Sequence, residues 1–221
     1  MNPPQIGPAS RQAAQSGEPP HGPRARMRRT LLDTAQRMMA AGITPSVAEL
    51  AEAAEVSRAT AYRYFPSQSA LIAAVVDQSL GPLLDWQARA GDAGARVDEL
   101  FTYAYPRLEE HEAPLRAALM VSLQQQAAAR AGDQATPLLV RGHRVDTLRH
   151  VLAPLADRLE PAALQRVAQA LSLLYGTEVF LVLKDIWKLD LEGITDVVRW
   201  TAQAIIAQAE RDAAGAAGGQ T

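Results

Sequence analysis

The chain has 221 residues, of which 48% are hydrophobic and 21% charged, and its 22 basic and 24 acidic residues give a net charge of −2. This composition is typical of a globular protein and excludes a wholly disordered one. Cysteine is absent, which excludes disulfides, thiolate catalysis and cysteine zinc sites. No apolar run reaches the roughly 18 residues of a membrane span, and the N-terminus lacks the apolar core of a secretory signal, so we expect a cytoplasmic protein without a membrane partner.

The charge differs between the two parts of the chain. Residues 1–68, called the head, contain eight arginines, no lysine and five acidic residues, so their net charge is +3. Residues 69–221, called the body, therefore carry −5. The overall charge argues against a nucleic-acid partner, but a basic head on an acidic body is typical of a protein that binds nucleic acid at one end only.

Helical periodicity dominates the chain, and no alternation typical of strands is found. The Pro-containing residues 1–23 are predicted to form a disordered tail and the Ala/Gly-rich residues 213–221 a flexible one. Pro106 and Pro154 lie within helical pattern, where they predict a kink or a break. The fold class is therefore all-α with about nine helices, predicted near residues 24–41, 47–54, 58–65, 68–84, 96–110, 114–130, 137–159, 161–187 and 193–212.

Residues 46–65 are predicted to form two short helices joined by the turn Glu55-Val56-Ser57. Ser46 is placed to cap the first helix, with Glu49 completing a capping box, and Ser57 is placed to cap the second. A helix-turn-helix lays its second helix in the major groove of DNA. The second helix has small side chains at Ala59 and Ala61, which permit close approach to DNA. Its cationic or hydrogen-bonding side chains are Arg58, Thr60, Tyr62, Arg63 and Tyr64.

In this region, residues 26–76 resemble the tetracycline-repressor (TetR) family of bacterial regulators. The similarity consists of an N-terminal helix followed by Val47-Ala48-Glu49-Leu50-Ala51, by Val56-Ser57-Arg58-Ala59-Thr60-Ala61-Tyr62-Arg63-Tyr64-Phe65-Pro66-Ser67, and by a helix that opens at Ala70-Leu71-Ile72. It implies a three-helix DNA-binding domain over 24–68 and a helical ligand-binding and dimerisation domain over 69–212. It also implies a homodimer that offers one recognition helix to each half of a near-palindromic, double-stranded DNA operator.

The resemblance implies phosphate contacts for Ser46, Thr60, Tyr62 and Tyr64, and base contacts for Arg58 and Ala59. The predicted DNA-binding residues, with the cap and the two flanking positions included, are Ser46, Ser57, Arg58, Ala59, Thr60, Tyr62, Tyr64, Gln68 and Arg28. Core packing is the alternative for Tyr62 and Tyr64, and Phe65 is the better core candidate. Arg28 belongs to a cluster with Arg24, Arg26 and Arg29, for which a solvated helix end is the alternative.

Three positions depart from the family pattern. Glu55 stands where glycine is usual in the turn, which predicts a strained left-handed backbone. Tyr64 stands where histidine is common, and its hydroxyl still suits a phosphate oxygen. Gln68 stands where a lysine usually opens the fourth helix, which removes one cationic phosphate contact.

The body supplies the predicted dimer interface and effector site. Residues 161–187 and 193–212 show the most apolar late patterns, and in the family the last two helices pair with those of a second subunit; burial inside a monomer is the alternative. Between about 83 and 180 we expect a small-molecule pocket. Its candidate residues, each of which also fits ordinary core packing, are Trp86, Tyr103, Tyr105, Met120, Gln124, His143, Tyr175 and Glu178. Glu178 needs a partner if buried, and an arginine across the dimer is an alternative to a ligand.

No pattern of metal ligands or catalytic residues stands out. His143 and His150, and the run from Glu109 to Glu112, lack a recognised third ligand, so neither a metal nor a cofactor is expected. The sequence therefore predicts a nucleoid-associated transcriptional repressor that an unknown small molecule releases from its operator. The alternatives are a DNA-binding protein of the same fold that senses no ligand and a helical-bundle enzyme.

Overall fold

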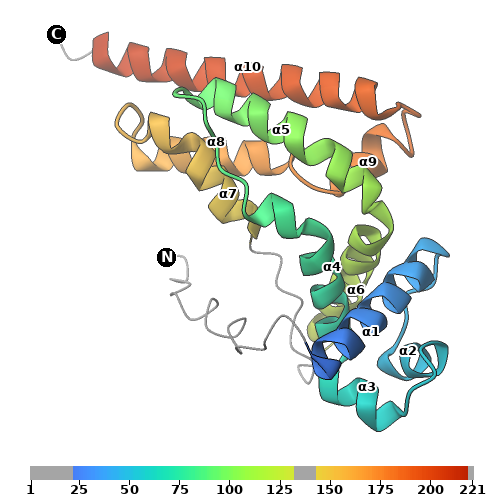
Figure 1. Cartoon of the computed structure of the whole chain (residues 1–221). Coiled ribbons are helices and arrows are strands. Elements are labelled where there is room, and N and C mark those ends of the chain that lie inside the picture. Colours follow the sequence, from blue (N-terminus) through green and yellow to red (C-terminus); the bar gives the residue numbers. More distant parts are fainter. Residues whose placement is uncertain (1–21, 132–142, 219–221) are drawn as a thin grey trace.

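A computed structural model of the chain describes residues 22–131 and 143–218 (Figure 1). Most of the predicted N-terminal tail lies outside them. The described residues form ten α-helices, nine of them with seven residues or more, which confirms the all-α prediction. The helices are α1 (Pro23–Ala40), α2 (Val47–Ala53), α3 (Arg58–Tyr64), α4 (Gln68–Leu84), α5 (Ala93–Glu110), α6 (Glu112–Arg130), α7 (His143–Leu152), α8 (Pro161–Ser172), α9 (Glu178–Leu183) and α10 (Leu191–Gly218).

The prediction of a single helix over 161–187 is wrong. The chain leaves the helix after Ser172 and re-enters one at Glu178, and Gly176 between them has φ 155°. The apolar spacing continues across this break and so conceals it. Two carbonyl groups at the break are bound by side chains from other helices: Arg144 Nη1 donates to Ser172 O (3.1 Å) and Tyr105 Oη donates to Leu174 O (2.5 Å).

Proline acts differently in two other helices. α7 ends at Leu152, and Pro154 lies in a short 3-10 turn (Ala153–Leu155), which confirms the predicted break. The part of that predicted helix before residue 143 lies outside the described residues. α5 continues through Pro106 to Glu110, so Pro106 does not end its helix. α10 runs on to Gly218, beyond the end predicted at residue 212.

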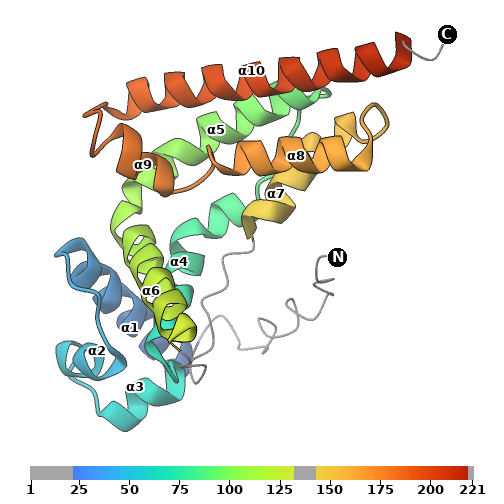
Figure 2. The same cartoon turned by 180° about the vertical axis from the view of Figure 1, so that it is seen from behind.

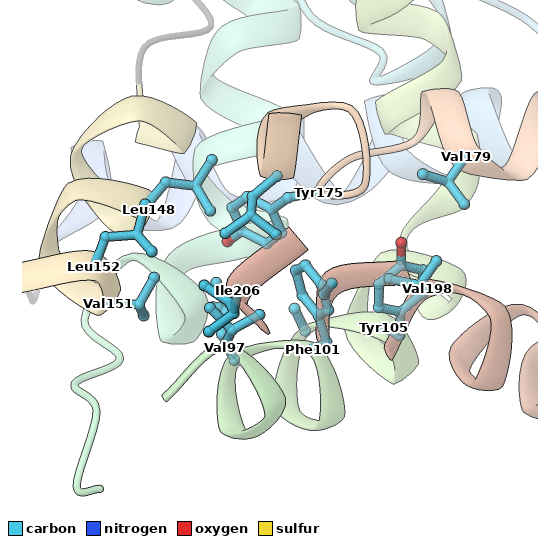
Figure 3. Packing of buried hydrophobic residues seen from close by; sticks show 14 of the residues in the cluster. Val97, Phe101, Tyr105, Leu148, Val151, Leu152, Tyr175, Val179, Val198 and Ile206 are labelled. Atoms are coloured by element: carbon cyan, nitrogen blue, oxygen red, sulfur yellow. The ribbon is translucent and has the colours of Figure 1, made fainter. Parts of the chain in front are cut away.

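The described residues contain two hydrophobic clusters. The head core comprises Leu31, Leu32, Ala35, Met39, Val47, Leu50, Ala51, Ala61, Phe65, Leu71, Ile72, Val75, Ala117, Ala118 and Val121. The body core is built mainly by α5, α7, α8, α9 and α10, with Phe101, Tyr105 and Phe180 as its largest fully buried members. Figure 3 shows part of it, including Phe101 against Tyr175, whose ring centroids lie 6.3 Å apart.

The two cores lie at opposite ends of the molecule. In both Figure 1 and Figure 2, α1, α2 and α3 form one end, whereas α5, α8 and α10 form the other. α4 and α6 run between them and pack against each other. In the described part of the chain, no helix is long and apolar enough to cross a membrane.

Candidate nucleic-acid interface

The start of α2 has the capping box that the sequence predicts. The backbone N–H of Glu49 donates to Ser46 Oγ (3.2 Å), and the backbone N–H of Ser46 donates to Glu49 Oε2 (2.7 Å). These hydrogen bonds hold the pKa of the Glu49 carboxyl below its usual value. The Ser46 hydroxyl therefore has an internal structural role in addition to the phosphate contact predicted for it.

The turn between α2 and α3 has the predicted left-handed backbone. Glu55 has φ 54°, in the region that glycine adopts without strain. The turn is closed by the Val56 N–H, which donates to Ala51 O (2.9 Å). A residue with a Cβ in this conformation carries a local strain of about 1 kcal/mol or more, which glycine avoids.

The recognition helix α3 buries one face and exposes the other. Ala61 and Phe65 are buried in the head core, whereas Arg58, Ala59 and Arg63 are exposed. Ser57 caps the helix by accepting from the Thr60 N–H (3.1 Å), and the hydroxyls of Ser57 and Thr60 lie 2.9 Å apart. The exposed face thus carries groups suited to base edges and phosphates along a rigidly capped first turn.

The two tyrosines of α3 have different environments. Tyr62 is 47% exposed, so it is not a core aromatic. Tyr64 is half-buried and packs against the head core, with its ring centroid 6.5 Å from that of Phe65 and the Arg63 guanidinium 5.7 Å from its ring. Tyr64 is therefore in part a core residue, as the alternative interpretation holds, whereas Tyr62 is not.

The two flanking candidates have partners within the head. The Arg28 guanidinium lies 5.8 Å from the centroid of the Phe65 ring, so it joins α1 to the end of α3. Gln68 Nε2 donates to the carbonyl oxygens of Thr44 (3.4 Å) and Pro45 (3.2 Å). Arg26 and Arg29 of the same cluster are exposed at the start of α1.

Four of the eight candidate pocket residues lie in two separate places. Trp86 stacks on Tyr103 with centroids 6.3 Å apart, and Tyr103 Oη donates to Pro82 O at the end of α4 (3.3 Å). Tyr175 and Glu178 lie at the corner between α8 and α9. Met120 and Gln124 are exposed on α6, and the side chain of His143 lies outside the described residues.

The pair at the corner has partners in its own chain. Arg144 Nη2 donates to Glu178 Oε2 (2.7 Å), so Glu178 has an arginine partner within its own subunit; an arginine across the dimer was the alternative to a ligand. Burial raises the pKa of the Tyr175 hydroxyl to about 12, and a hydrogen bond with Thr147 opposes that rise. Tyr105 is fully buried, and its hydroxyl binds the carbonyl of Leu174. These contacts stabilise the break between the two helices.

An apolar groove of about 350 Å³ lies between α8 and α10. Its lining residues are Leu159, Ala163, Arg166, Val167, Ala170, Trp200, Thr201, Ala204, Ile205, Gln208, Ala209 and Asp212. None of the candidate pocket residues lines it. The exposed large hydrophobic side chains of the same end are Leu173, Val182, Ile186, Trp187, Val197 and Trp200. The groove thus lies on the two helix segments that the sequence predicts as the dimer interface.

A charged network at the start of α6 was not predicted. Arg116 donates to both carboxylate oxygens of Asp185 (2.7 and 2.8 Å) and to Glu112 (2.7 Å). Lys184 donates to Glu109 (3.0 Å) and Glu112 (2.8 Å). The i, i+4 spacing of Glu112 and Arg116 was a sequence signal for part of it. The network joins α5 and α6 to the residues that follow α9.

Comparisons with known proteins agree with this geometry. The family model described as bacterial regulatory proteins of the tetR family matches residues 31–75, which run from α1 into α4. Among solved structures, a tetR-family transcriptional regulator from Streptomyces coelicolor is 25% identical, with a TM-score of 0.59; the match covers 84% of this chain and 82% of that one.

A second solved structure, a TetR transcriptional regulator from Rhodococcus sp. RHA1, shares the fold at 15% identity and a TM-score of 0.52. That match covers 84% of this chain and 97% of the other. No curated protein sequence matches the chain. The protein is therefore a helix-turn-helix, DNA-binding transcriptional regulator rather than an enzyme. Its residues 31–75 match the tetR family of bacterial regulatory proteins, and its fold is similar to that of a solved tetR-family regulator.

Proposed function

We propose that this regulator is a repressor that binds a near-palindromic operator as a homodimer and is released by a small-molecule effector. The observation that carries the proposal is the separation of two surfaces. The exposed face of α3 lies at one end of the molecule and the apolar groove of α8 and α10 at the other. A second copy covering the groove leaves both recognition helices free for DNA.

The apolar end supports the dimer. Leu173 is 76% and Trp200 73% exposed, although each apolar side chain gains roughly 1.5–3 kcal/mol on full burial. Clusters of exposed apolar side chains mark interaction surfaces. A second copy is the occupant that a two-fold symmetric operator requires, because each half-site takes one recognition helix.

The course of α4 supports release by an effector. Its beginning supplies Leu71, Ile72 and Val75 to the head core, and its end is bound through Pro82 O to Tyr103 of α5. An effector that favours a different packing of α4 against α5 thereby changes the spacing of the two heads. Its different affinities for the two arrangements drive dissociation from DNA. The stacked pair Trp86 and Tyr103 is our candidate for part of the effector site.

Selection from a random pool of duplex DNA tests the proposal. We expect a motif with two-fold symmetry, half-site centres about one helical turn apart, two protomers bound per site by sedimentation, and lower expression of a reporter placed behind the motif. An asymmetric motif bound by one protomer contradicts the dimer, and higher reporter expression contradicts repression. If no compound of a small-molecule library releases the protein from the selected DNA, the result favours the alternative, a DNA-binding protein that senses no ligand.

Replacing Arg58 by alanine is expected to relax base preference at one symmetric pair of positions. Arg58 is exposed on the first turn of α3, where a guanidinium reaches guanine O6 and N7, and each lost contact costs roughly 1–3 kcal/mol. The selection experiment repeated with R58A measures the change. The same motif from the variant and the parent shows that Arg58 reads no base.

Replacing Tyr62 by alanine is expected to weaken binding to all DNA sequences by a similar factor. The exposed Tyr62 hydroxyl suits a phosphate oxygen, and phosphate contacts carry no direct sequence information. Affinities for the selected operator and for an unrelated duplex, measured at one salt concentration, check the prediction. Loss of affinity for the operator alone argues against the phosphate role.

A further inference from the structure

The first turn of α4 is bound from two sides by amide side chains. Gln68 Nε2 donates to the carbonyls of Thr44 and Pro45, at 3.4 and 3.2 Å. On the next residue, the buried hydroxyl of Ser69 accepts from Gln125 Nε2 of α6 (2.5 Å). Two consecutive residues of α4 therefore connect it to the segment before α2 and to α6.

The Gln68 hydrogen bonds close a loop around the helix-turn-helix. Thr44 and Pro45 directly precede Ser46, the cap of α2, and Ser67 directly precedes Gln68. Residues 46–67, which hold α2 and α3, are thus attached to the start of α4 at both ends: by the peptide chain at one and by the Gln68 side chain at the other. These two attachments couple the orientation of α2 and α3 to the orientation of the start of α4.

The chemistry of the amide group opposes the phosphate contact expected at this position. A glutamine has only its NH₂ group to donate, and phosphate oxygens only accept. In Gln68 this group points to the two carbonyls of the loop before α2. The remaining amide oxygen is an acceptor, for which a phosphate diester offers no donor.

We propose that Gln68 and Gln125 are positioning residues that fix the orientation of the recognition helix relative to α4 and α6, and that the Gln68 side chain contacts no phosphate; the proposal rests on the operator binding proposed above. Binding to an operator requires both recognition helices in one orientation, whereas binding to unrelated DNA depends mainly on charge. Losing the Gln68 bonds therefore lowers affinity for the operator and leaves affinity for unrelated DNA unchanged.

The test uses Gln68→Met, which keeps the length of the side chain and removes the donor. Gln125→Met removes the second connection, and Gln126→Met, at an exposed position of α6, is the matched control. Affinities for the operator selected by the parent and for an unrelated duplex are measured at fixed salt, with thermal unfolding as the check on folding. The operator is first selected from random DNA with the parent protein. If the parent selects no operator, the proposed function fails before the variants are tested, so the two failures are distinguished.

We expect Gln68→Met to lower operator affinity about fivefold, the equivalent of one net hydrogen bond, with unrelated DNA bound as by the parent. Gln125→Met is expected to show the same pattern and Gln126→Met no change. An equal loss for both DNAs with Gln68→Met makes the side chain a phosphate contact and overturns the proposal. Unchanged affinity for both DNAs in the two variants overturns it as well. If Gln68→Met does not fold, the same comparison of operator and unrelated DNA is made with Gln125→Met alone: loss for the operator only supports the proposal, and any other result overturns it.

Discussion

Replacing Gly176 by alanine is expected to lower the free energy of unfolding by about 2 kcal/mol. Gly176 has φ 155°, a backbone conformation that side chains rarely adopt. A Cβ there overlaps the guanidinium of Arg144 and the carboxylate of Glu178. The arginine must move, which breaks its bonds to Glu178 and to Ser172 O, while the backbone strain remains. Urea denaturation of the parent and the variant measures the difference.

Gly81→Ala is the matched control for this prediction. Gly81 lies within α4, and a Cβ at this position meets nothing within 4 Å. Alanine is favoured over glycine inside a helix by about 1 kcal/mol, so this variant is expected to be at least as stable as the parent. Equal stability of G176A and the parent shows that the corner accepts a side chain and that the break between α8 and α9 does not depend on glycine.

Replacing Trp200 by glutamate is expected to convert the proposed dimer into monomers and to lower operator affinity about a hundredfold or more. Trp200 is 73% exposed and lines the groove between α8 and α10. In the proposed dimer a carboxylate at this position is buried without a partner on an apolar surface, which is strongly unfavourable. Each head then binds its half-site alone. Sedimentation equilibrium and operator titration measure the two effects.

Leu123→Glu separates this effect from a general response to added charge. Leu123 is 57% exposed on α6, away from the groove, so its replacement is expected to leave the subunit association unchanged. A W200E variant that remains dimeric places the interface elsewhere. Dimers that persist in W200E but fail to bind the operator indicate an effect of Trp200 on the arrangement of the heads rather than on association.

The sequence predicted the head well because its determinants are local. The capping box of Ser46 and Glu49 depends on residues three positions apart, and the strained turn at Glu55 depends on one residue in a known pattern. Gln68 shows the limit of such reasoning. Its role as an interhelix connection depends on Thr44 and Pro45, which no local pattern links to it.

The body was predicted less well because its contacts are distant in sequence. The break at Gly176 is concealed by apolar spacing that continues across it, and it is stabilised by Arg144 and Tyr105 from other helices. Glu178 was a candidate because a buried carboxylate needs a partner, but only the fold shows that this partner is Arg144. Exposure of Trp200 likewise depends on which side of α10 packs on α5.

Exchange of heads between related regulators is constrained by α6. Ala117, Ala118 and Val121 of this helix belong to the head core, although they follow the recognition helix only after the whole of α4 and α5. A chimera that grafts residues 1–68 onto a foreign body therefore places the apolar face of α1 against foreign side chains of α4 and α6, whose sizes do not match it. The unit that packs together in this protein is the head with the start of α4 and one side of α6. New DNA specificity therefore arises more readily by substitutions on the exposed face of α3 than by recombination at the end of the head.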